Sequence, residues 1–365
     1  MQTYKVFFGP KDPLKASAPT VEQRRAAVSR DNSACPFSRF VGNEKAIRKL
    51  QAAAFDALGK ENHLCRDLAF ALYGPASCGK TTLAKMYAKV VELPFVEVSP
   101  KSVKSMDDLF ELIERVLKEQ GVPLVEVVRR DYYVMPPTVL FFDEVHTVSQ
   151  SVVDGLLKAT EHSDGMLVTE SGKTVNCYNV CWMLATTDEG KLFDAFRTRF
   201  SPVNLKYLPK KDIAKIVSLA HPDFDGETCD LVAHYNSRVP RKALEFARYM
   251  KLVHQMEPGR SWAVVAQEVA SDEGIDAHGM HETHLAILRA LGQGPIAKNR
   301  IVNVAGKKAE EVERFIMPWL LTETDDSAAL AVVTNKGYTI TPAGLAELDK
   351  RGIPHKGSAV LPKAA

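Results

Sequence analysis

A short stretch of the sequence has the residue types and the spacing of a phosphate-binding loop. Residues 74–81 read Gly-Pro-Ala-Ser-Cys-Gly-Lys-Thr and fit the pattern G-x-x-x-x-G-K-[ST]. The glycines allow backbone N–H groups to close around a phosphate at a helix N-terminus, where the helix dipole favours anions. Lys80 would neutralise the β- and γ-phosphate oxygens, and Thr81 would offer its hydroxyl to Mg²⁺. The loop predicts that ATP and Mg²⁺ bind at Gly74, Pro75, Ala76, Ser77, Cys78, Gly79, Lys80, Thr81 and Thr82.

A second motif ends in two acidic residues. Residues 139–142 read Val-Leu-Phe-Phe, and Asp143 and Glu144 follow directly. Open α/β sheets place their ligands at the C-terminal ends of the strands, so both carboxylates are expected at the nucleotide site. Asp143 is expected to hold Mg²⁺ through water, and Glu144 to polarise the water that attacks the γ-phosphate. An apolar strand that ends in Asp-Glu is common, but its place after the phosphate loop predicts an ATPase.

Strands and helices that alternate along the chain would position both motifs. Residues 68–73 form a short continuous apolar run, which is typical of a strand buried on both faces of a sheet. Further strands are expected at 95–99, 139–142 and 180–185, and helices at 79–91 and 106–120. This alternation favours an α/β fold with a mostly parallel sheet. From about residue 209 to residue 270 the pattern is helical throughout.

The order of these motifs resembles the AAA+ ATPases. After the phosphate loop and Asp-Glu, the chain continues with Leu-Ala-Thr-Thr-Asp and then with Phe-Arg-Thr-Arg-Phe. The resemblance implies that a threonine of the first segment orients the attacking water; Thr186 and Thr187 both fit, and Thr187 is preferred. It also implies that an arginine of the second segment closes the site of a neighbouring subunit. Arg199 is the expected residue, with Arg197 as the alternative.

The helical region adds a further arginine to the resemblance. Arg241, in the sequence Val-Pro-Arg, resembles the sensor 2 arginine that reaches the γ-phosphate from a helical lid in this family. The arginine that closes the site of a neighbouring subunit, called the arginine finger, must come from another copy of the chain. The resemblance therefore implies a homo-oligomeric ring, and a hexamer is expected.

Within the AAA+ ATPases, the chain resembles the RuvB family of Holliday-junction branch-migration motors. Residues 143–146, Asp-Glu-Val-His, resemble the Asp-Glu-Ile-His of RuvB, and residues 238–241, Arg-Val-Pro-Arg, resemble its sensor 2 segment. The order of the C-terminal elements also agrees, so that the resemblance covers roughly residues 38–352. It implies DNA as the partner, either a four-way junction or a duplex, and a RuvA-like junction-binding protein as a candidate partner.

Two segments depart from the RuvB pattern. Residues 165–176 are expected to form a β-hairpin where RuvB docks its junction-binding partner, but they lack the Gly-rich, Arg-containing run of that hairpin. This difference puts docking of a RuvA-like protein in doubt. Residues 121–137 form an insertion before the Asp-Glu strand and include Arg-Arg-Asp-Tyr-Tyr. The insertion is either a surface elaboration or a contact with DNA or a partner.

The C-terminal region has the pattern of a winged helix. Residues 281–352 read as three helices followed by a β-ribbon. The apolar face of the recognition helix is expected to consist of Val312, Phe315, Ile316 and Leu320. Asn-Lys-Gly at residues 335–337 is a strong turn signal for the wing.

Cations of this region are candidates for DNA contact. Lys336 is expected at the tip of the wing, where it can reach a phosphate, and Lys307 and Lys308 precede the recognition helix. Residues 310–313 include three glutamates that would face any DNA beside that helix. This arrangement disfavours reading of a base sequence and favours backbone contact through the wing. A winged helix that docks a protein is the alternative.

Composition limits the class of protein. The 365 residues are 45% hydrophobic and 25% charged, which are ordinary globular values and exclude a mostly disordered chain. No apolar stretch approaches the roughly 20 residues that span a bilayer, and six cysteines without a Cys-x-x-Cys pair indicate reduced thiols in the cytoplasm. With 47 basic and 45 acidic residues the net charge is +2, which disfavours general binding of polyanions.

The sequence thus predicts an AAA+ core with a parallel sheet, a helical lid and a winged helix. The expected divisions are a partly disordered arm at 1–38 with a short strand at 4–8, a core at 39–205, a lid at 206–272, a winged helix at 279–354 and a tail at 355–365. The expected function is that of a DNA motor that couples ATP hydrolysis to branch migration or related translocation, with roles in recombination and repair. Two alternatives stay open: an ATPase that remodels or recruits protein partners through the winged helix, and a nucleotide switch that loads DNA machinery.

Overall fold

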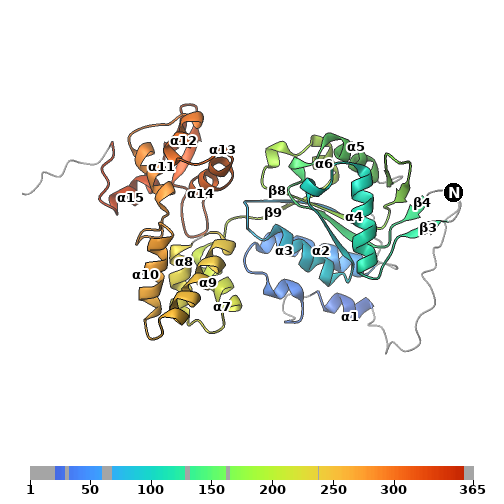
Figure 1. The fold of residues 1–365 in the computed structure, drawn as a ribbon, viewed down its shortest axis with the longest axis horizontal. Coiled ribbons are helices and arrows are strands. Elements are labelled where there is room, and N and C mark those ends of the chain that lie inside the picture. Colours follow the sequence, from blue (N-terminus) through green and yellow to red (C-terminus); the bar gives the residue numbers. More distant parts are fainter. Residues whose placement is uncertain are drawn as a thin grey trace, which may run out of the picture.

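In a computed structural model of the chain, the described residues are 21–28, 33–59, 68–127, 132–161, 165–236 and 238–356. They form two lobes, with the α/β core in one and the helical lid and C-terminal domain together in the other (Figure 1). The strand expected at 4–8 and the tail from residue 357 lie outside the described residues. None of the helices in the described ranges is long and apolar enough to cross a membrane.

A five-stranded parallel sheet forms the core. Its strand order is β2 (Phe95–Val98), β5 (Thr138–Phe142), β8 (Val180–Thr186), β1 (Ala69–Tyr73) and β9 (Ser201–Asn204). All four pairings are parallel, so the C-terminal ends of the strands lie along one edge. The predicted parallel sheet is confirmed. The edge strand β9 was not predicted, because its polar sequence Ser-Pro-Val-Asn has no continuous apolar run.

Helices cover both faces of this sheet. On one face, α2 (Glu44–Leu58) and α3 (Lys80–Val90) pack with the segment at Pro36–Arg39 around one apolar cluster. On the other, α4 (Met106–Glu119), α5 (Gln150–Ala159) and α6 (Asp194–Arg199) surround a second cluster. The remaining short elements are α1 (Val21–Ala26) and 3₁₀ turns at Pro100–Ser102, Val145–Thr147 and Glu189–Lys191.

A second, four-stranded sheet combines the expected hairpin with the insertion. Its order is β3 (Val125–Val127), β4 (Tyr132–Val134), β7 (Thr174–Asn176) and β6 (Met166–Val168). The predicted hairpin is present as the antiparallel pair β6 and β7. The insertion at 121–137 contributes β3 and β4, and β4 pairs in parallel with β7, so the insertion extends the hairpin sheet. Residues 128–131, which include its arginine pair, lie outside the described residues.

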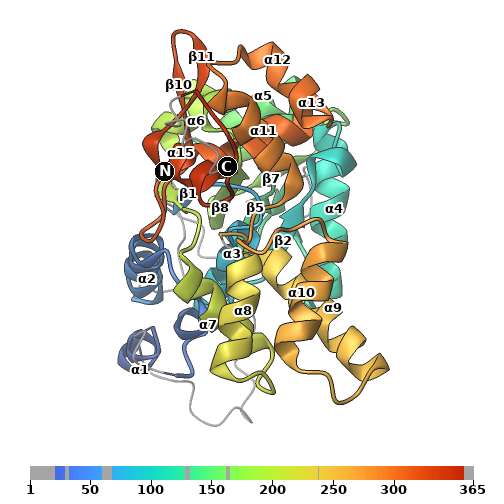
Figure 2. The same ribbon diagram turned by 90° about the vertical axis from the view of Figure 1, so that its left-hand side faces the viewer.

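The lid and the C-terminal domain each have an apolar core. The lid consists of α7 (Lys210–Ala220), α8 (Gly226–Tyr235), α9 (Pro240–Met256) and α10 (Trp262–Asp272). The C-terminal domain begins with α11 (Glu282–Gly292) and α12 (Lys298–Ala305). Its third helix is continuous and consists of α13 (Ala309–Glu311), a π-helical turn (Val312–Ile316) and α14 (Met317–Leu321). The hairpin of β10 (Ala331–Thr334) and β11 (Gly337–Ile340) follows, and then α15 (Pro342–Asp349). This is the expected three-helix and ribbon arrangement, followed by α15. The domain stands above the lid in Figure 2.

The expected apolar face of the third helix needs one correction. Val312, Ile316 and Leu320 are buried, but Phe315 is 51% exposed. An α-helix advances by about 100° per residue, whereas a π-helical turn spreads more residues over each turn and so advances less. Phe315 lies within the π-helical turn and is therefore rotated away from the domain core.

The lid and the C-terminal domain are joined by a buried arginine. Arg238 is only 4% exposed and donates hydrogen bonds to the carbonyl oxygens of Trp319 and Thr322 and to the hydroxyl of Ser327. Its guanidinium also lies over the Trp319 ring, 4.7 Å from the centroid. Because all three acceptors belong to the C-terminal domain, Arg238 fixes that domain to the lid.

Candidate active site

A cavity of about 710 Å³ lies between the α/β core and the lid. The predicted nucleotide residues that line it are Ala76, Ser77, Cys78, Gly79, Lys80, Thr81, Thr82, Asp143, Glu144 and Arg241. Its remaining lining comes from the chain around Phe40, from Met86 of α3, from Leu208 and Ile216 of the lid, from the first half of α9 and from Phe315 of the C-terminal domain. Three separate parts of the fold therefore enclose the site.

The phosphate loop connects β1 to α3 through residues in left-handed conformations. The φ values are +151° at Gly74, +60° at Ser77 and +94° at Gly79, the last directly before α3 begins. A Cβ atom at Gly74 would lie 2.5 Å from the carbonyl oxygen of Leu205, so a side chain cannot be placed there without a shift of the backbone. Successive N–H groups in such conformations form an anion-binding concavity at the helix N-terminus.

Lys80 and the residues around it fit a nucleotide with Mg²⁺. Lys80 is 6% exposed, and its ammonium donates to the carbonyl oxygens of Gly74 and Pro75 at 2.9 Å each. The Thr81 hydroxyl lies 3.4 Å from Asp143 Oδ2, so two oxygen donors converge beside the loop, and oxygen is the ligand type that Mg²⁺ takes. Burial, and next the carboxylate of Glu144, raise the pKa of Asp143, while Lys80 opposes the shift. A bound cation would offset the free-energy cost of keeping the carboxylate of Asp143 charged.

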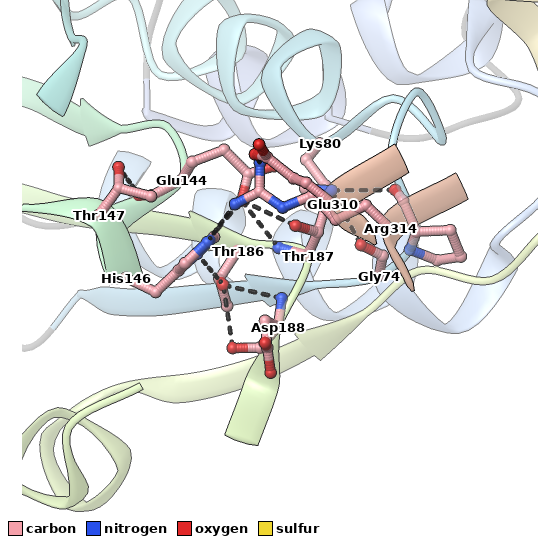
Figure 3. A network of polar contacts seen from close by, with 11 residues as sticks. Gly74, Lys80, Glu144, His146, Thr147, Thr186, Thr187, Asp188, Glu310 and Arg314 are labelled. Atoms are coloured by element: carbon pink, nitrogen blue, oxygen red, sulfur yellow. Dashed lines mark hydrogen bonds and ion pairs between the residues drawn. The ribbon is translucent and has the colours of Figure 1, made fainter. Parts of the chain in front are cut away.

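Glu144 is positioned by Thr187. The residue follows β5 with φ +50°, and its Oε2 accepts hydrogen bonds from the N–H and the hydroxyl of Thr187, both at 3.0 Å. The hydroxyl oxygen of Thr186 instead lies 2.8 Å from His146 Nδ1, and the residue is buried. Of the two threonines predicted to orient the attacking water, Thr187 is therefore the one whose hydroxyl contacts the carboxylate of Glu144 (Figure 3).

A second cavity of about 790 Å³ adjoins the other side of the phosphate loop. Three further predicted site residues, Gly74, Pro75 and Thr187, line this cavity and not the first one. The opposite wall belongs to the C-terminal domain and is formed by Glu310, Glu313, Arg314 and Pro318. The predicted site residues are therefore divided between two cavities on either side of the loop.

The predicted arginine finger lies away from the nucleotide cavity of its own chain. Arg199 ends α6, and its side chain, 29% exposed, lies 3.9 Å from Glu161 in an ion pair. Arg197 bonds the Glu189 carbonyl oxygen and lies 3.8 Å from Asp194. Neither arginine is among the residues that line the two cavities in the described part of the chain, whereas Arg241 lines the first.

Three site features were not predicted. His146 bonds Thr186, Arg314 bonds His146, and Phe315 lines the nucleotide cavity. His146 belongs to the Asp-Glu-Val-His segment, so its place in the sequence was a usable signal. Arg314 has no comparable signal, because it is separated from its partner by 168 positions and lies in another domain.

Comparisons with known proteins agree with this geometry. Residues 70–206 match the ATPase family associated with various cellular activities (AAA). The chain is 24% identical over 293 residues to the Holliday junction branch migration complex subunit RuvB of Lactobacillus delbrueckii subsp. bulgaricus, across 76% of this chain and 80% of that protein. It is 25% identical over 344 residues to the same subunit of Latilactobacillus sakei subsp. sakei, across 87% of this chain and 91% of that protein. The solved structure of the Thermotoga maritima RuvB Holliday junction branch migration motor superposes with a TM-score of 0.65 at 21% identity, across 85% of this chain and 95% of that one.

Proposed function

Since the chain is an AAA ATPase related to RuvB, we propose that it is an ATP-dependent DNA motor of RuvB type. The observation that carries the proposal is the C-terminal winged-helix domain, which follows the α/β core and the lid in one chain, together with a superposition on the RuvB structure that extends across 85% of this chain. The RuvB subunits of two bacteria also match most of the chain, beyond the AAA segment alone. The proposed activity is ATP hydrolysis coupled to branch migration or to related DNA translocation.

The nucleotide cavity supports in-line attack of water on the γ-phosphate. Lys80 would leave its two carbonyl partners and move onto the phosphate oxygens, and Thr81 and Asp143 would hold Mg²⁺. The metal ion supplies charge neutralisation on the phosphates. Glu144, which Thr187 holds in place, would orient the water. The exposed Arg241 would reach the γ-phosphate from the lid.

A ring of subunits completes the site in this proposal. Arg199 is partly exposed at the end of α6 and lies outside its own nucleotide cavity, which suits a residue that acts on the neighbour. We expect a hexamer, in which each site receives Arg199 from the next subunit. A positive charge placed at the transferred phosphoryl group stabilises the charge of the transition state.

DNA contact is assigned to the wing and not to the third helix. Glu310 and Glu313 line the cavity beside the ATPase core, so this face of the helix is turned toward the protein. Lys336 is exposed at the tip of the β10–β11 hairpin, and Lys307 and Lys308 are exposed before α13. These cations suit contact with the phosphate backbone, independent of base sequence.

The β6–β7 hairpin offers little to a RuvA-like partner. Glu170 at its tip accepts hydrogen bonds from the N–H groups of Met106 and Asp107 at 3.1 and 3.0 Å, and thereby caps α4. Ser171 donates its N–H to the Asp107 carboxylate at 3.0 Å. The polar groups of the tip are thus used within the chain, and any loading partner is expected to dock elsewhere.

The proposal is tested by ATPase assays with four-way junction, duplex and single-stranded DNA across a range of salt concentrations. A DNA motor should be stimulated by DNA, and the stimulation should fall steeply with salt because backbone contacts release counterions. Junction DNA that stimulates no better than duplex would remove branch migration and leave a DNA translocase. Hydrolysis that no DNA stimulates would refute the motor and favour remodelling of protein partners through the winged helix.

A further inference from the structure

We infer that Arg314 of the winged-helix domain is a positioning residue of the ATPase site, which acts through His146 on Glu144 within the same chain. The inference rests on the proposed ATPase function and deepens it, because it assigns a route from the DNA-binding domain to the catalytic carboxylate. Three groups carry it: a guanidinium from one domain, an imidazole beside the Asp-Glu motif, and the carboxylate itself (Figure 3).

The guanidinium of Arg314 is held between the two domains. Its Nη2 lies 2.8 Å from His146 Nε2 in the α/β core, and its Nη1 lies 3.0 Å from Glu310 one helical turn earlier. The side chain is 30% exposed, so the contact is partly shielded from water. Glu310 therefore fixes the guanidinium on the winged-helix side, and His146 receives it on the core side.

The direction of this hydrogen bond fixes the tautomer of His146. Arginine has donors only, so His146 Nε2 must accept, and the proton of the neutral ring must be on Nδ1. Nδ1 lies 2.8 Å from the Thr186 hydroxyl oxygen and 3.3 Å from Glu144 Oε2. Thr186 in turn donates its hydroxyl to the Asp188 carbonyl oxygen at 3.1 Å. A chain of oriented hydrogen bonds thus runs from Arg314 to the strand end that carries Thr187.

Glu144 lies where this chain meets the nucleotide site. Its Oε2 accepts two hydrogen bonds from Thr187 and faces the Nδ1–H of His146. The orientation of the carboxylate therefore depends on Thr187 directly and on the ring of His146 beside it. Without Arg314 the imidazole loses the donor that holds Nε2 as an acceptor, so the ring and its Nδ1–H are held less firmly toward Thr186 and Glu144.

The local backbone supports a functional role for this contact. Arg314 lies in the π-helical turn Val312–Ile316, and such turns are found frequently at functional sites. The same turn directs Phe315 into the lining of the nucleotide cavity. Two consecutive residues of the winged-helix domain therefore reach the ATPase site, one on each side of the phosphate loop.

Steady-state kinetics test the inference through a division between kcat and KM. Arg314→Ala should lower kcat for ATP hydrolysis about tenfold, equivalent to about 1.4 kcal/mol, and should leave KM for ATP within about twofold, because the residue positions Glu144 and does not hold the nucleotide. Arg289→Ala is the matched control, since Arg289 is an exposed arginine on α11 of the same domain. Equal kcat values for the two variants would overturn the inference.

A second variant tests whether the effect passes through His146. In His146→Asn the side-chain amide can lie at the position of Nδ1, but no acceptor faces Arg314, so nothing fixes whether its N–H or its oxygen points toward Thr186 and Glu144. This variant should reproduce the kcat of Arg314→Ala, and the double variant should be no slower than either single variant. Independent, multiplicative losses of kcat would show that the two residues act separately and would refute the route.

The tautomer provides a readout that needs no hydrolysis. In ¹⁵N-histidine NMR spectra of the full chain, with the signal of His146 assigned from its absence in His146→Asn, the wild type should show a protonated Nδ1 and an unprotonated Nε2. Arg314→Ala should lose this fixed tautomer. A protonated Nε2 in the wild type would overturn the inference even if the protein is an active ATPase. A wild type without ATPase activity but with the expected tautomer would instead count against the proposed function alone.

Discussion

The winged-helix domain should lose stability as the pH falls below about 6.5, because it buries a neutral histidine. His284 on α11 lies against Trp319, with the ring centroids 4.4 Å apart. Neither of its ring nitrogens has a hydrogen-bond partner among the described residues. Burial, followed by the charges of His281 and Arg238, lowers the pKa of His284 to about 3.

The sign and size of the effect follow from proton uptake by the unfolded chain. Between pH 6.5 and pH 3 the unfolded state binds a proton at His284 that the folded state does not, so the free energy of unfolding falls as the pH falls. The loss is about 1.4 kcal/mol for each pH unit, and it amounts to about 2 kcal/mol between pH 7 and pH 5. The contribution is fully present above this window.

The three tryptophans make the assay specific for this domain. Trp182 lies in β8 of the core, Trp262 in α10 of the lid and Trp319 in α14 of the winged helix. Replacing the first two by Phe leaves Trp319 fluorescence as a reporter of winged-helix unfolding in urea. The free energy of unfolding, measured at pH 7, 6 and 5, should decrease by the amount given above.

His284→Leu is the control that isolates the histidine. An apolar side chain of similar size removes the titrating group and the two unpaired nitrogens, so the variant should keep its stability from pH 7 to pH 5. His281, whose pKa burial also lowers, is present in both proteins and cancels in the comparison. Parallel pH dependences for the wild type and His284→Leu would refute the reasoning.

Three further predictions concern the nucleotide site. Lys80→Ala should reduce ATP turnover by about 100-fold or more, because it removes the ammonium group that neutralises the phosphate oxygens. ATP hydrolysis and nucleotide binding are both measured for this variant. Arg199→Ala should bind ATP and hydrolyse it poorly, and mixing it with Glu144→Gln should recover part of the activity in mixed rings; no recovery would exclude a finger acting on the neighbour. Phe315→Ala should raise KM for ATP with little change in kcat, since Phe315 lines the cavity with an apolar ring that has no group to donate or accept a proton.

The sequence predicted those parts of the fold that depend on local pattern. The buried strands β1, β5 and β8 have continuous apolar runs, and the phosphate loop has a fixed spacing of glycines, Lys80 and Thr81. β9 escaped prediction because its pairing with β1 depends on a neighbour far away in the chain. Short polar strands of this kind become strands only when a sheet edge is available.

The choice between Thr186 and Thr187 shows where local pattern ends. Successive side chains of a strand point to opposite faces, so only one of the two can meet Glu144. Which one it is depends on the register of β8 against its neighbours, where Thr186 pairs with Tyr73 at the end of β1. The sequence does not determine that register, but the hydrogen bonds of Glu144 identify Thr187.

The winged-helix domain contacts both the lid and the core, and the strengths of these contacts indicate which one breaks first. Arg238 joins the lid to the winged helix with three hydrogen bonds and is almost fully buried. Asp326 of the winged helix adds a fourth bond, accepted from the N–H of Lys210 at the start of α7 at 2.7 Å. Arg314 joins the winged helix to the core through His146 and is partly exposed.

If a bound nucleotide draws the lid closer to the core, it must strain the contacts that join the winged-helix domain to the lid and to the core. Breaking the lid–winged-helix contacts would leave the buried charge of Arg238 without acceptors, which costs several kcal/mol. Breaking the contact of Arg314 costs less, because the Arg314 side chain is already 30% exposed and keeps its ion pair with Glu310. The lid and the winged helix should therefore move as one unit against the core, and the contact that bears the strain of this movement is the one that positions Glu144. In this way, a load on the wing and the state of the nucleotide would act on the same carboxylate.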